Sequence, residues 1–337
     1  MPATNSIVDI KGIQVGQAQD DTALTGCTVI LCETGAVAGI DQRGGAPGTR
    51  ETDLLQPMHL VEKVHAIVLS GGSAYGLDAA SGVMRYLEEK KVGFNTGVAR
   101  VPIVPAAVIF DLSVGDPRIR PDAAMGYAAC QQASNIRPKE GNFGAGTGAT
   151  VGKIFGMKQA MKSGIGTASV EIGGGVIVAA MIVVNAFGDV WDPDTRCIIS
   201  GARTFFRKHE EHELNNFADT LQTMKSFIGR TTISFASHQN TVIGVVATNA
   251  YLTKEEVNKV AQMSHNGIAA TIRPAHTMFD GDTIFVLSLG KRIGDVSIIG
   301  SFAAVAVEKA ILSAVRTAQG INNLPSASSI LNMNTQL

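Results

Sequence analysis

The order of apolar and polar residues along the chain predicts both strands and helices, in no strictly alternating sequence. Short runs that are almost entirely apolar are typical of strands buried on both faces. A stretch with two such runs, 25–40, predicts two short strands around a turn at Glu33 to Gly35. Further strands are predicted at 64–70, 173–184, 241–248 and 283–289.

Helices are predicted where apolar residues recur every three or four positions. This spacing holds over 76–90, where Leu77, Ala80, Val83 and Leu87 fall on one face. Further helices are expected over 121–134, from a capping box at Thr253 to Glu256, and over the Ala-rich stretch 300–318. Strands and helices that mix in this way favour a layered α+β fold over a regular doubly wound one.

Two segments differ from the rest in composition. Residues 203–230 are the most polar part of the chain and predict a surface segment or linker. The tail 321–337 is polar and is expected to fray. No internal repeat is visible, and a chain of this length can form one large domain or two closely packed ones.

Composition excludes several classes of protein. Of 337 residues 45% are hydrophobic and 17% charged, and the net charge is -1. Such a chain is too apolar to be disordered and too evenly charged to favour nucleic-acid binding. The 37 glycines, which follow no Gly-X-Y period, indicate closely packed layers with tight turns.

The longest apolar run, 176–184, is too short to span a membrane, and the first residues do not resemble a signal peptide. We therefore expect a cytoplasmic protein without a membrane partner. The four cysteines are scattered and form no CxxC pair, which disfavours a disulfide framework or metal site. We expect buried thiols and no metal or cofactor.

Two glycine-rich stretches invite functional interpretations. Gly71-Gly72-Ser73 lies between a strand and a helix, but a nucleophile elbow would need glycine where Tyr75 stands. A Ser73 helix cap is the simpler reading, and a Ser73 hydrolase stays as an alternative. The stretch 144–153 (GAGTGATVGK) fails the P-loop pattern and is better explained as a close-packed loop that positions Lys153.

Polar residues near two predicted strands suggest further chemistry. Asp280-Gly281-Asp282 is a common turn, yet two carboxylates two residues apart on an extended chain point to one side. They could share or relay a proton, with His276 as a base or simply a hydrogen-bonding residue. Thr241 opens a strand directly after the most polar segment, an unusual place for an otherwise ordinary residue.

Six stretches taken together resemble the DmpA-like family of L-aminopeptidase/D-amidases and β-aminopeptidases, and in particular its nylon-oligomer hydrolase branch. They occur in one order over most of residues 20–320. The matching stretches are SGGSAYGLDAASGV (70–83), AAVIFDL (106–112), GAGTGATVGK (144–153), VVNAFGDV (183–190), NTVIGVVATN (240–249) and HTMFDGDTIF (276–285).

The resemblance implies an N-terminal-nucleophile hydrolase with a four-layer αββα sandwich of the DmpA/ornithine-acetyltransferase type. Self-cleavage would occur between Asn240 and Thr241, giving an α-chain of residues 1–240 and a β-chain of 241–337 within one globular unit. Thr241 would be the nucleophile. Asp280 and Asp282 would orient Thr241. Lys153 and Asn185 would support this nucleophile and hold the oxyanion. Phe110 occupies a position where relatives often carry Tyr.

The resemblance also sets the expected substrates and assembly. Substrates would be small amides or oligoamides, such as 6-aminohexanoate oligomers or the N-terminal residues of short peptides. An aminopeptidase acting on L-, D- or β-amino acid amides is the alternative within the family. Homo-oligomers, commonly tetramers of the α/β pair, are expected. Because Phe110 departs from the family pattern, a catalytically silent binding protein with this fold is a further alternative.

Overall fold

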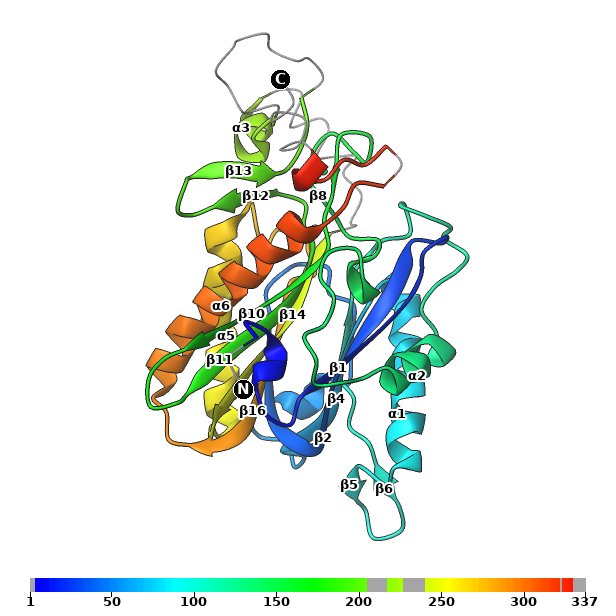
Figure 1. Cartoon of the computed structure of the whole chain (residues 1–337), viewed down its shortest axis with the longest axis vertical. Coiled ribbons are helices and arrows are strands. Elements are labelled where there is room, and N and C mark those ends of the chain that lie inside the picture. Colours follow the sequence, from blue (N-terminus) through cyan, green and yellow to red (C-terminus); the bar gives the residue numbers. More distant parts are fainter. Residues whose placement is uncertain (1–3, 205–216, 227–239, 322, 330–337) are drawn as a thin grey trace.

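The computed structural model describes residues 4–204, 217–226, 240–321 and 323–329. Within them, one large sheet has the strand order β10-β11-β14-β16-β2-β4-β7-β3, and β1 pairs with β2 beside this path. Figure 1 shows helices on both sides of this sheet. Its strands are β1 (Gln14–Asp20), β2 (Thr25–Gln42), β3 (Thr49–Arg50), β4 (Lys63–Ser70), β7 (Ala106–Val108), β10 (Ile165–Glu171), β11 (Ile177–Asn185), β14 (Thr241–Ala250) and β16 (Thr283–Arg292).

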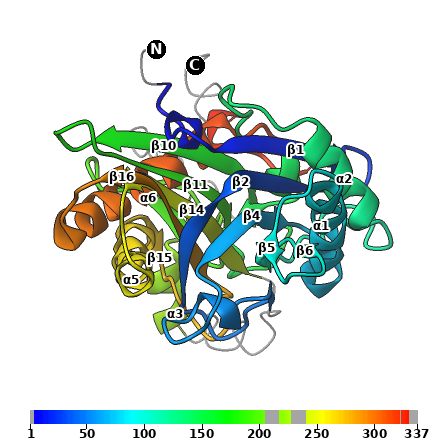
Figure 2. The same cartoon turned by 90° about the horizontal axis from the view of Figure 1, so that it is seen from below.

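Strand β2 joins the two halves of this sheet. It is one strand of 18 residues, so the prediction of two short strands around Glu33 to Gly35 is wrong. An irregularity between Leu31 and Ala36 in the pairing with β4 takes up the residues where the turn was expected. Residues 25–31 of β2 pair with β1 and residues 37–42 with β16, so β2 passes from one half to the other (Figure 2).

Three apolar clusters show how the layers stack. In β14, Val246 belongs to the cluster shared with α5 and α6, while Val245 belongs to the cluster between the two sheet halves. In β4, Ile67 faces that central cluster and Val68 faces a third one, shared with α1 and α2. Successive side chains of a strand point to opposite faces, so each sheet half is buried on both sides. The layers therefore run αββα, as predicted.

The helices form the two outer layers. Helices α5 and α6 pack against each other on one side, and α1 and α2 do so on the other. The predicted capping box of Thr253 and Glu256 is present at the start of α5. The bounds are α1 (Ala79–Glu89), α2 (Ala123–Gln131), α3 (Thr220–Lys225), α5 (Lys254–Thr271) and α6 (Val296–Thr317), with 3-10 helices η1 (Ile7–Asp9), η2 (Asp53–Leu55), η3 (Ser73–Asp78) and η4 (Gly144–Gly146).

Helix α6 is long and apolar enough to cross a membrane by length and composition alone. It packs against α5, β10 and β11, and its buried side chains belong to the cluster under this layer. It begins at Val296, after an Asp295 cap whose side chain accepts the Ile298 N–H. The helix therefore starts four residues before the predicted Gly300. Its apolar character is explained by the core that it covers.

Other differences from the predictions are local. The strand expected from 173 begins only at Ile177, because Gly173, Gly174 and Gly175 have positive φ and form a turn. Strand β10 was not predicted. Most of the polar segment 203–230 lies outside the described residues, as does the end of the tail, 330–337. The short strands are β5 (Phe94–Asn95), β6 (Arg100–Val101), β8 (Thr150–Val151), β9 (Met161–Lys162), β12 (Asp189–Asp192), β13 (Cys197–Ser200) and β15 (Ile272–Arg273).

Candidate active site

Thr241 is the first residue of β14, in the interior of the large sheet between β11 and β16. It pairs in register with Asn185, the last residue of β11. The preceding residue, Asn240, forms an isolated parallel bridge with Asp280, which lies three positions before β16. All four side chains are buried. The sheet therefore collects four of the predicted site residues at one end of three adjacent strands.

The peptide bond before Thr241 has close polar neighbours. The Thr241 hydroxyl donates to the Asn240 carbonyl, and this is its single side-chain hydrogen bond among the described residues. The N–H of Gly281 donates to the same carbonyl oxygen at 3.0 Å. The Asn240 carbonyl thus accepts hydrogen bonds from a side-chain hydroxyl and from a backbone N–H.

A glycine-rich loop, 43–48, closes over this end of the sheet. The N–H of Ala46 donates to the Asp280 carbonyl at 2.8 Å and that of Gly45 to the Thr277 carbonyl at 3.0 Å. A Cβ on Gly44 would lie 2.1 Å from the Asp280 carbonyl oxygen, so only glycine fits there. This loop was not predicted to be part of the site, although its Gly44-Gly45 pair is a sign of close backbone approach.

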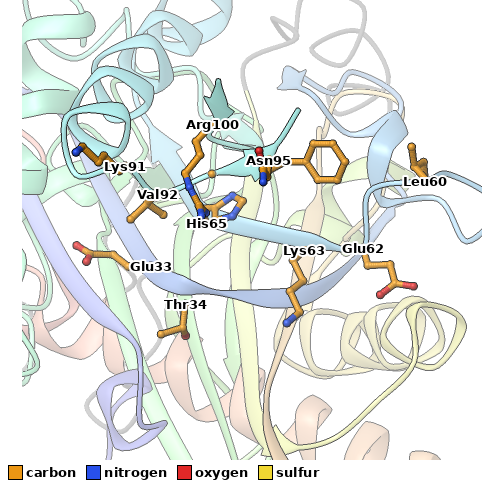
Figure 3. Close-up of a pocket in the computed structure, with 12 residues that line it drawn as sticks. Glu33, Thr34, Leu60, Glu62, Lys63, His65, Lys91, Val92, Asn95 and Arg100 are labelled. Atoms are coloured by element: carbon orange, nitrogen blue, oxygen red, sulfur yellow. The ribbon is translucent and has the colours of Figure 1, made fainter. Parts of the chain in front are cut away.

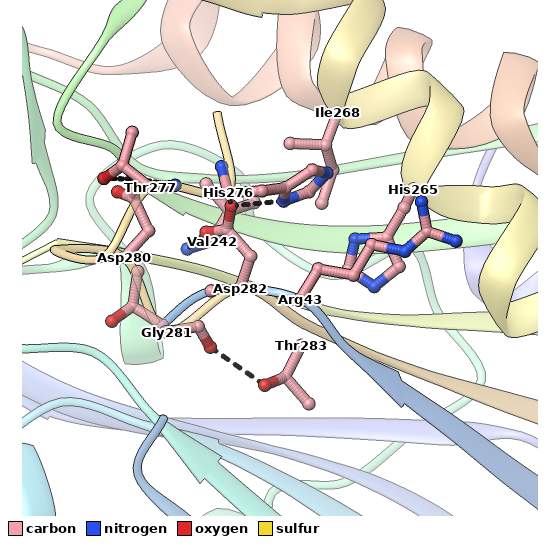
Figure 4. Close-up of polar contacts among 12 residues, drawn as sticks. Arg43, Val242, His265, Ile268, His276, Thr277, Asp280, Gly281, Asp282 and Thr283 are labelled. Carbon is pink, nitrogen blue, oxygen red and sulfur yellow. Dashed lines mark hydrogen bonds and ion pairs between the residues drawn. The ribbon is translucent and has the colours of Figure 1, made fainter. Parts of the chain in front are cut away.

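The two predicted carboxylates are both buried, but they face different partners (Figure 4). Asp282 accepts the N–H of Val242, the residue after Thr241, at 2.8 Å. Its other oxygen lies 2.7 Å from Nδ1 of His276. Asp280 accepts the N–H and hydroxyl of Thr277 at 2.9 and 2.5 Å. Burial raises the pKa of Asp280 to about 6, and the neighbouring charge of Asp282 acts in the same direction.

Lys153 and Asn185 form a second polar pair beside Thr241. The Lys153 Nζ donates to the side-chain Oδ1 of Asn185 at 2.8 Å and to its carbonyl oxygen at 3.1 Å. Burial lowers the pKa of Lys153 to about 7, although the charges of Asp280 and Asp111 oppose this shift. An amine with this pKa can exchange a proton near neutral pH.

The loop that carries Lys153 is as close-packed as its glycines predicted. Gly152 has φ +71°, and a Cβ there would lie 2.0 Å from the backbone nitrogen of Ala202. The N–H of Lys153 donates to the Phe187 carbonyl at 3.0 Å. These contacts direct the Lys153 side chain toward Asn185, as expected for a close-packed loop that positions this lysine.

Phe110 contributes through its main chain. Its carbonyl oxygen accepts from Nδ2 of Asn185 at 3.1 Å, so the Asn185 amide is oriented from both ends. The Phe110 side chain is half-buried. The hydrogen bond to Asn185 therefore does not depend on whether Phe or Tyr occupies this position.

The alternative nucleophile, Ser73, lies elsewhere. It is the first residue of η3 rather than its cap, and Gly72 takes the cap position with φ +77°. The predicted Ser73 cap is therefore wrong. Within the described part of the chain its hydroxyl has no hydrogen bond to a histidine or carboxylate, whereas Gly72 is held by a bond from its N–H to Asp111 Oδ1 at 2.7 Å. This geometry does not build a serine triad.

Other possible sites are poorly developed. In the described ranges no group of three or more His, Cys, Asp or Glu side chains could hold a metal ion. Cys27, Cys32 and Cys130 are buried and Cys197 is exposed, and all four are free thiols. A cavity of about 480 Å³ near β5 and β6 shares no residue with the Thr241 cluster, and its charged side chains, including Lys63 and Lys91, point in different directions (Figure 3).

Comparison with known proteins identifies the family of this chain. The model of peptidase family S58 matches residues 5–326. The chain is 41% identical to an uncharacterised aminopeptidase of Mycobacterium tuberculosis, over 95% of this chain and 96% of the relative. It is 31% identical to a 6-aminohexanoate-oligomer endohydrolase of Kocuria sp., over 91% of this chain and 85% of the relative.

Solved structures show the same fold at low sequence identity. A β-aminopeptidase of Burkholderia sp. superposes with a TM-score of 0.69 at 18% identity, covering 99% of this chain and 94% of that one. The L-aminopeptidase D-Ala-esterase/amidase of Ochrobactrum anthropi, described as a variant of the Ntn-hydrolase fold, gives 0.69 and 18% over 99% and 95%. From the family match and this fold, the chain belongs to peptidase family S58, the DmpA-like family, and is an amide-bond hydrolase with an Ntn-hydrolase fold.

Proposed function

We propose that the protein is a self-processing hydrolase of short linear amides, with Thr241 as its N-terminal nucleophile. The observation that carries the proposal is the peptide bond before Thr241. Its carbonyl accepts from the Thr241 hydroxyl on one side and from the Gly281 N–H on the other. A strand can begin without a side-chain hydroxyl and a backbone N–H that both donate to one buried carbonyl oxygen.

Self-cleavage follows from this arrangement. The Thr241 oxygen bonds to the Asn240 carbonyl carbon, and the developing oxyanion is stabilised by the Gly281 N–H. The C–N bond then breaks, the Thr241 nitrogen takes up a proton, and an ester joins Asn240 to the Thr241 oxygen. Water hydrolyses this ester, which releases the Asn240 carboxyl group and restores the Thr241 hydroxyl. The products are residues 1–240 and 241–337.

The hydroxyl proton needs an acceptor. Lys153 is a candidate because its lowered pKa of about 7 leaves much of the amine neutral near that pH. Asp280 is a second candidate, since its raised pKa of about 6 makes it a stronger base than an exposed aspartate. Asp282 instead holds the main chain at Val242 and thereby orients the nucleophile.

Turnover would use the same groups on an external amide. A free Thr241 amine, with an ordinary pKa of about 7.7–8.0, could accept the hydroxyl proton. The Asn185 side-chain amide would donate to the oxyanion, a contribution of about 3 kcal/mol in comparable sites. The resulting acyl-enzyme is then released by water. Each step uses groups of the protein and solvent.

The relatives indicate two substrate classes. Those at 40–41% identity are called aminopeptidases, and three at 31% are called 6-aminohexanoate-oligomer endohydrolases. The higher identity favours removal of N-terminal residues from short peptides or amino acid amides over endo-cleavage of oligoamides. A panel of L-, D- and β-alanine p-nitroanilides, with the 6-aminohexanoate dimer and trimer alongside, would rank these classes directly. We also propose that the α/β pair assembles into homo-oligomers and works in the cytoplasm.

Intact-mass measurement of the purified protein tests the proposal. We expect two masses, those of residues 1–240 and 241–337, and a single uncut mass for Thr241→Ala, with no amidase activity. Thr241→Ser keeps the hydroxyl and should cut itself, while Ser73→Ala should behave as wild type. An uncut wild-type chain that still hydrolyses amides would refute the proposal.

A further inference from the structure

Two histidines beside Asp282 have no part in the chemistry proposed above. His276 lies in the segment before β16, and His265 lies on α5 (Figure 4). The His265 side chain is fully buried and that of His276 is 19% exposed. Within the described residues one nitrogen of each ring has a hydrogen-bond partner, while Nδ1 of His265 and Nε2 of His276 have none.

His276 binds Asp282 twice. Its ring Nδ1 lies 2.7 Å from Asp282 Oδ2, and its backbone N–H donates to the same oxygen at 3.0 Å. The other carboxylate oxygen accepts the Val242 N–H at 2.8 Å. A carboxylate that accepts all three bonds requires a proton on Nδ1 of His276. Asp282 thus links His276 to the main chain next to Thr241.

His265 fixes the other side of the His276 ring. Its Nε2 lies 3.0 Å from the carbonyl oxygen of Asp41, which can only accept, so Nε2 carries the proton. Burial lowers the pKa of His265 to about 4, so this ring is neutral. The two rings meet edge-on, with centroids 4.9 Å apart and planes at 69°.

The backbone of His276 is also unusual. Its φ is +57°, in the left-handed region that residues other than glycine seldom occupy, although Asn, Asp and His do so more often. In this conformation the backbone N–H and the ring Nδ1 converge on one oxygen of Asp282. A strained backbone beside a candidate active site is a recognised sign of a functional constraint.

We infer that His276 is a positioning residue for the Asp282 carboxylate, and that the ring of His265 holds His276 in place. The inference rests on the proposed function, because it gives Asp282 the task of orienting Thr241. Fixing both carboxylate oxygens fixes the Val242 N–H and therefore the direction of the Thr241 hydroxyl. The imidazole acts as a donor of fixed direction, and it takes no proton from the substrate.

A matched pair of variants tests this role. In His276→Asn the side-chain amide nitrogen takes the place of Nδ1, and Asn tolerates the left-handed backbone. In His276→Gln the amide lies one methylene farther out, near the place of Nε2. We expect His276→Gln to lower kcat and the rate of self-cleavage by about 10–100-fold with little change in KM, the usual loss for an orienting partner. His276→Asn should stay within about threefold of wild type on both measures, by the same reasoning.

A second pair tests the supporting ring. His265→Phe keeps an edge-on aromatic contact and should keep most of kcat, whereas His265→Ala removes the contact and should lower kcat. Melting temperatures of all variants identify effects on stability. Equal kcat for His276→Asn and His276→Gln in folded proteins, whether both high or both low, would overturn the inference. An active Thr241→Ala protein would instead refute the proposed function, so the two failures are distinguishable.

Discussion

Asn185 and Thr241 lie opposite each other in register at the ends of β11 and β14. The same backbone pairing that builds the sheet therefore places an amide side chain beside the proposed nucleophile. In the intact chain that amide is already oriented, since it accepts from Lys153 and donates to the Phe110 carbonyl. The oxyanion site would exist before any bond is cut.

Replacing Asn185 separates its two roles. Asn185→Asp keeps an acceptor for Lys153 but loses the N–H donor, and it places a carboxylate oxygen near the Phe110 carbonyl. We expect kcat for an anilide substrate to fall by about 100–1,000-fold, as for other lost oxyanion donors. The extent of self-cleavage should fall less, because the Gly281 N–H serves that carbonyl. Gel electrophoresis measures the extent of self-cleavage, and steady-state kinetics on the same preparation measure kcat. Equal losses in the two quantities would contradict separate roles for Asn185.

The rate of self-cleavage should rise with pH through about 7. Burial lowers the pKa of Lys153 to about 7, and only the neutral amine accepts a proton. About one lysine in ten is then neutral at pH 6 and about nine in ten at pH 8. Time courses of a slowly cutting precursor such as Thr241→Ser measure this dependence. Lys153→Met should remove most of the rate, and a pH profile unchanged by that substitution would assign the step to Asp280.

Gly281→Ala should slow self-cleavage and destabilise the fold. A Cβ at this position would lie 2.6 Å from the Ala46 carbonyl oxygen and 3.0 Å from the Thr241 hydroxyl. The backbone must shift, at a cost of about 1–3 kcal/mol, and the Gly281 N–H then moves away from the Asn240 carbonyl. Urea unfolding of the uncut Thr241→Ala protein with and without Gly281→Ala measures the cost. A variant that cuts at the wild-type rate would remove Gly281 from the mechanism.

Phe110→Tyr should leave self-cleavage unchanged. The Asn185 amide binds the main-chain carbonyl of residue 110, which both side chains retain. The added hydroxyl should raise kcat, by up to about tenfold if it donates a hydrogen bond to the transition state. Intact mass tests whether self-cleavage is unchanged, and kcat for the alanine anilides tests whether turnover is faster. Loss of self-cleavage in Phe110→Tyr would show that the side chain of residue 110, and not only its carbonyl, influences Thr241.

Several strands and helices of the layers were predicted because their sequence patterns are strong, whereas the four-layer order came from the family resemblance. The runs at Val64 to Ser70 and Thr241 to Thr248 are mostly apolar, which is typical of strands buried on both faces. Strand β10 was not predicted, since its sequence GTASVE combines glycine with small and polar residues. Its place is decided by pairing with β11 and by close packing under α6, where a Cβ on Gly166 would meet the Ala310 carbonyl at 2.2 Å.

The candidate site was predictable only in part. Its residues come from stretches as far apart in the sequence as Phe110 and Asp282, and local patterns do not show that Lys153 reaches Asn185 or that β14 lies between β11 and β16. The resemblance to a family supplied those residues. The roles of the 43–48 loop and of His265 depend on the long-range approach of β2 and α5, which no spacing along the chain could indicate.

The positions of β14 and β16 in the sheet would determine how a cleaved protein stays folded. Both strands follow residue 240, yet they are inserted between β11 and β2, which precede it. Two polypeptides produced by a cut would stay interleaved as one body, held by hydrogen bonds along both borders. After unfolding, the two polypeptides would separate, and refolding would require them to associate again. Folding before cutting would therefore be a one-time event, so that the longevity of the enzyme would depend on how slowly it unfolds.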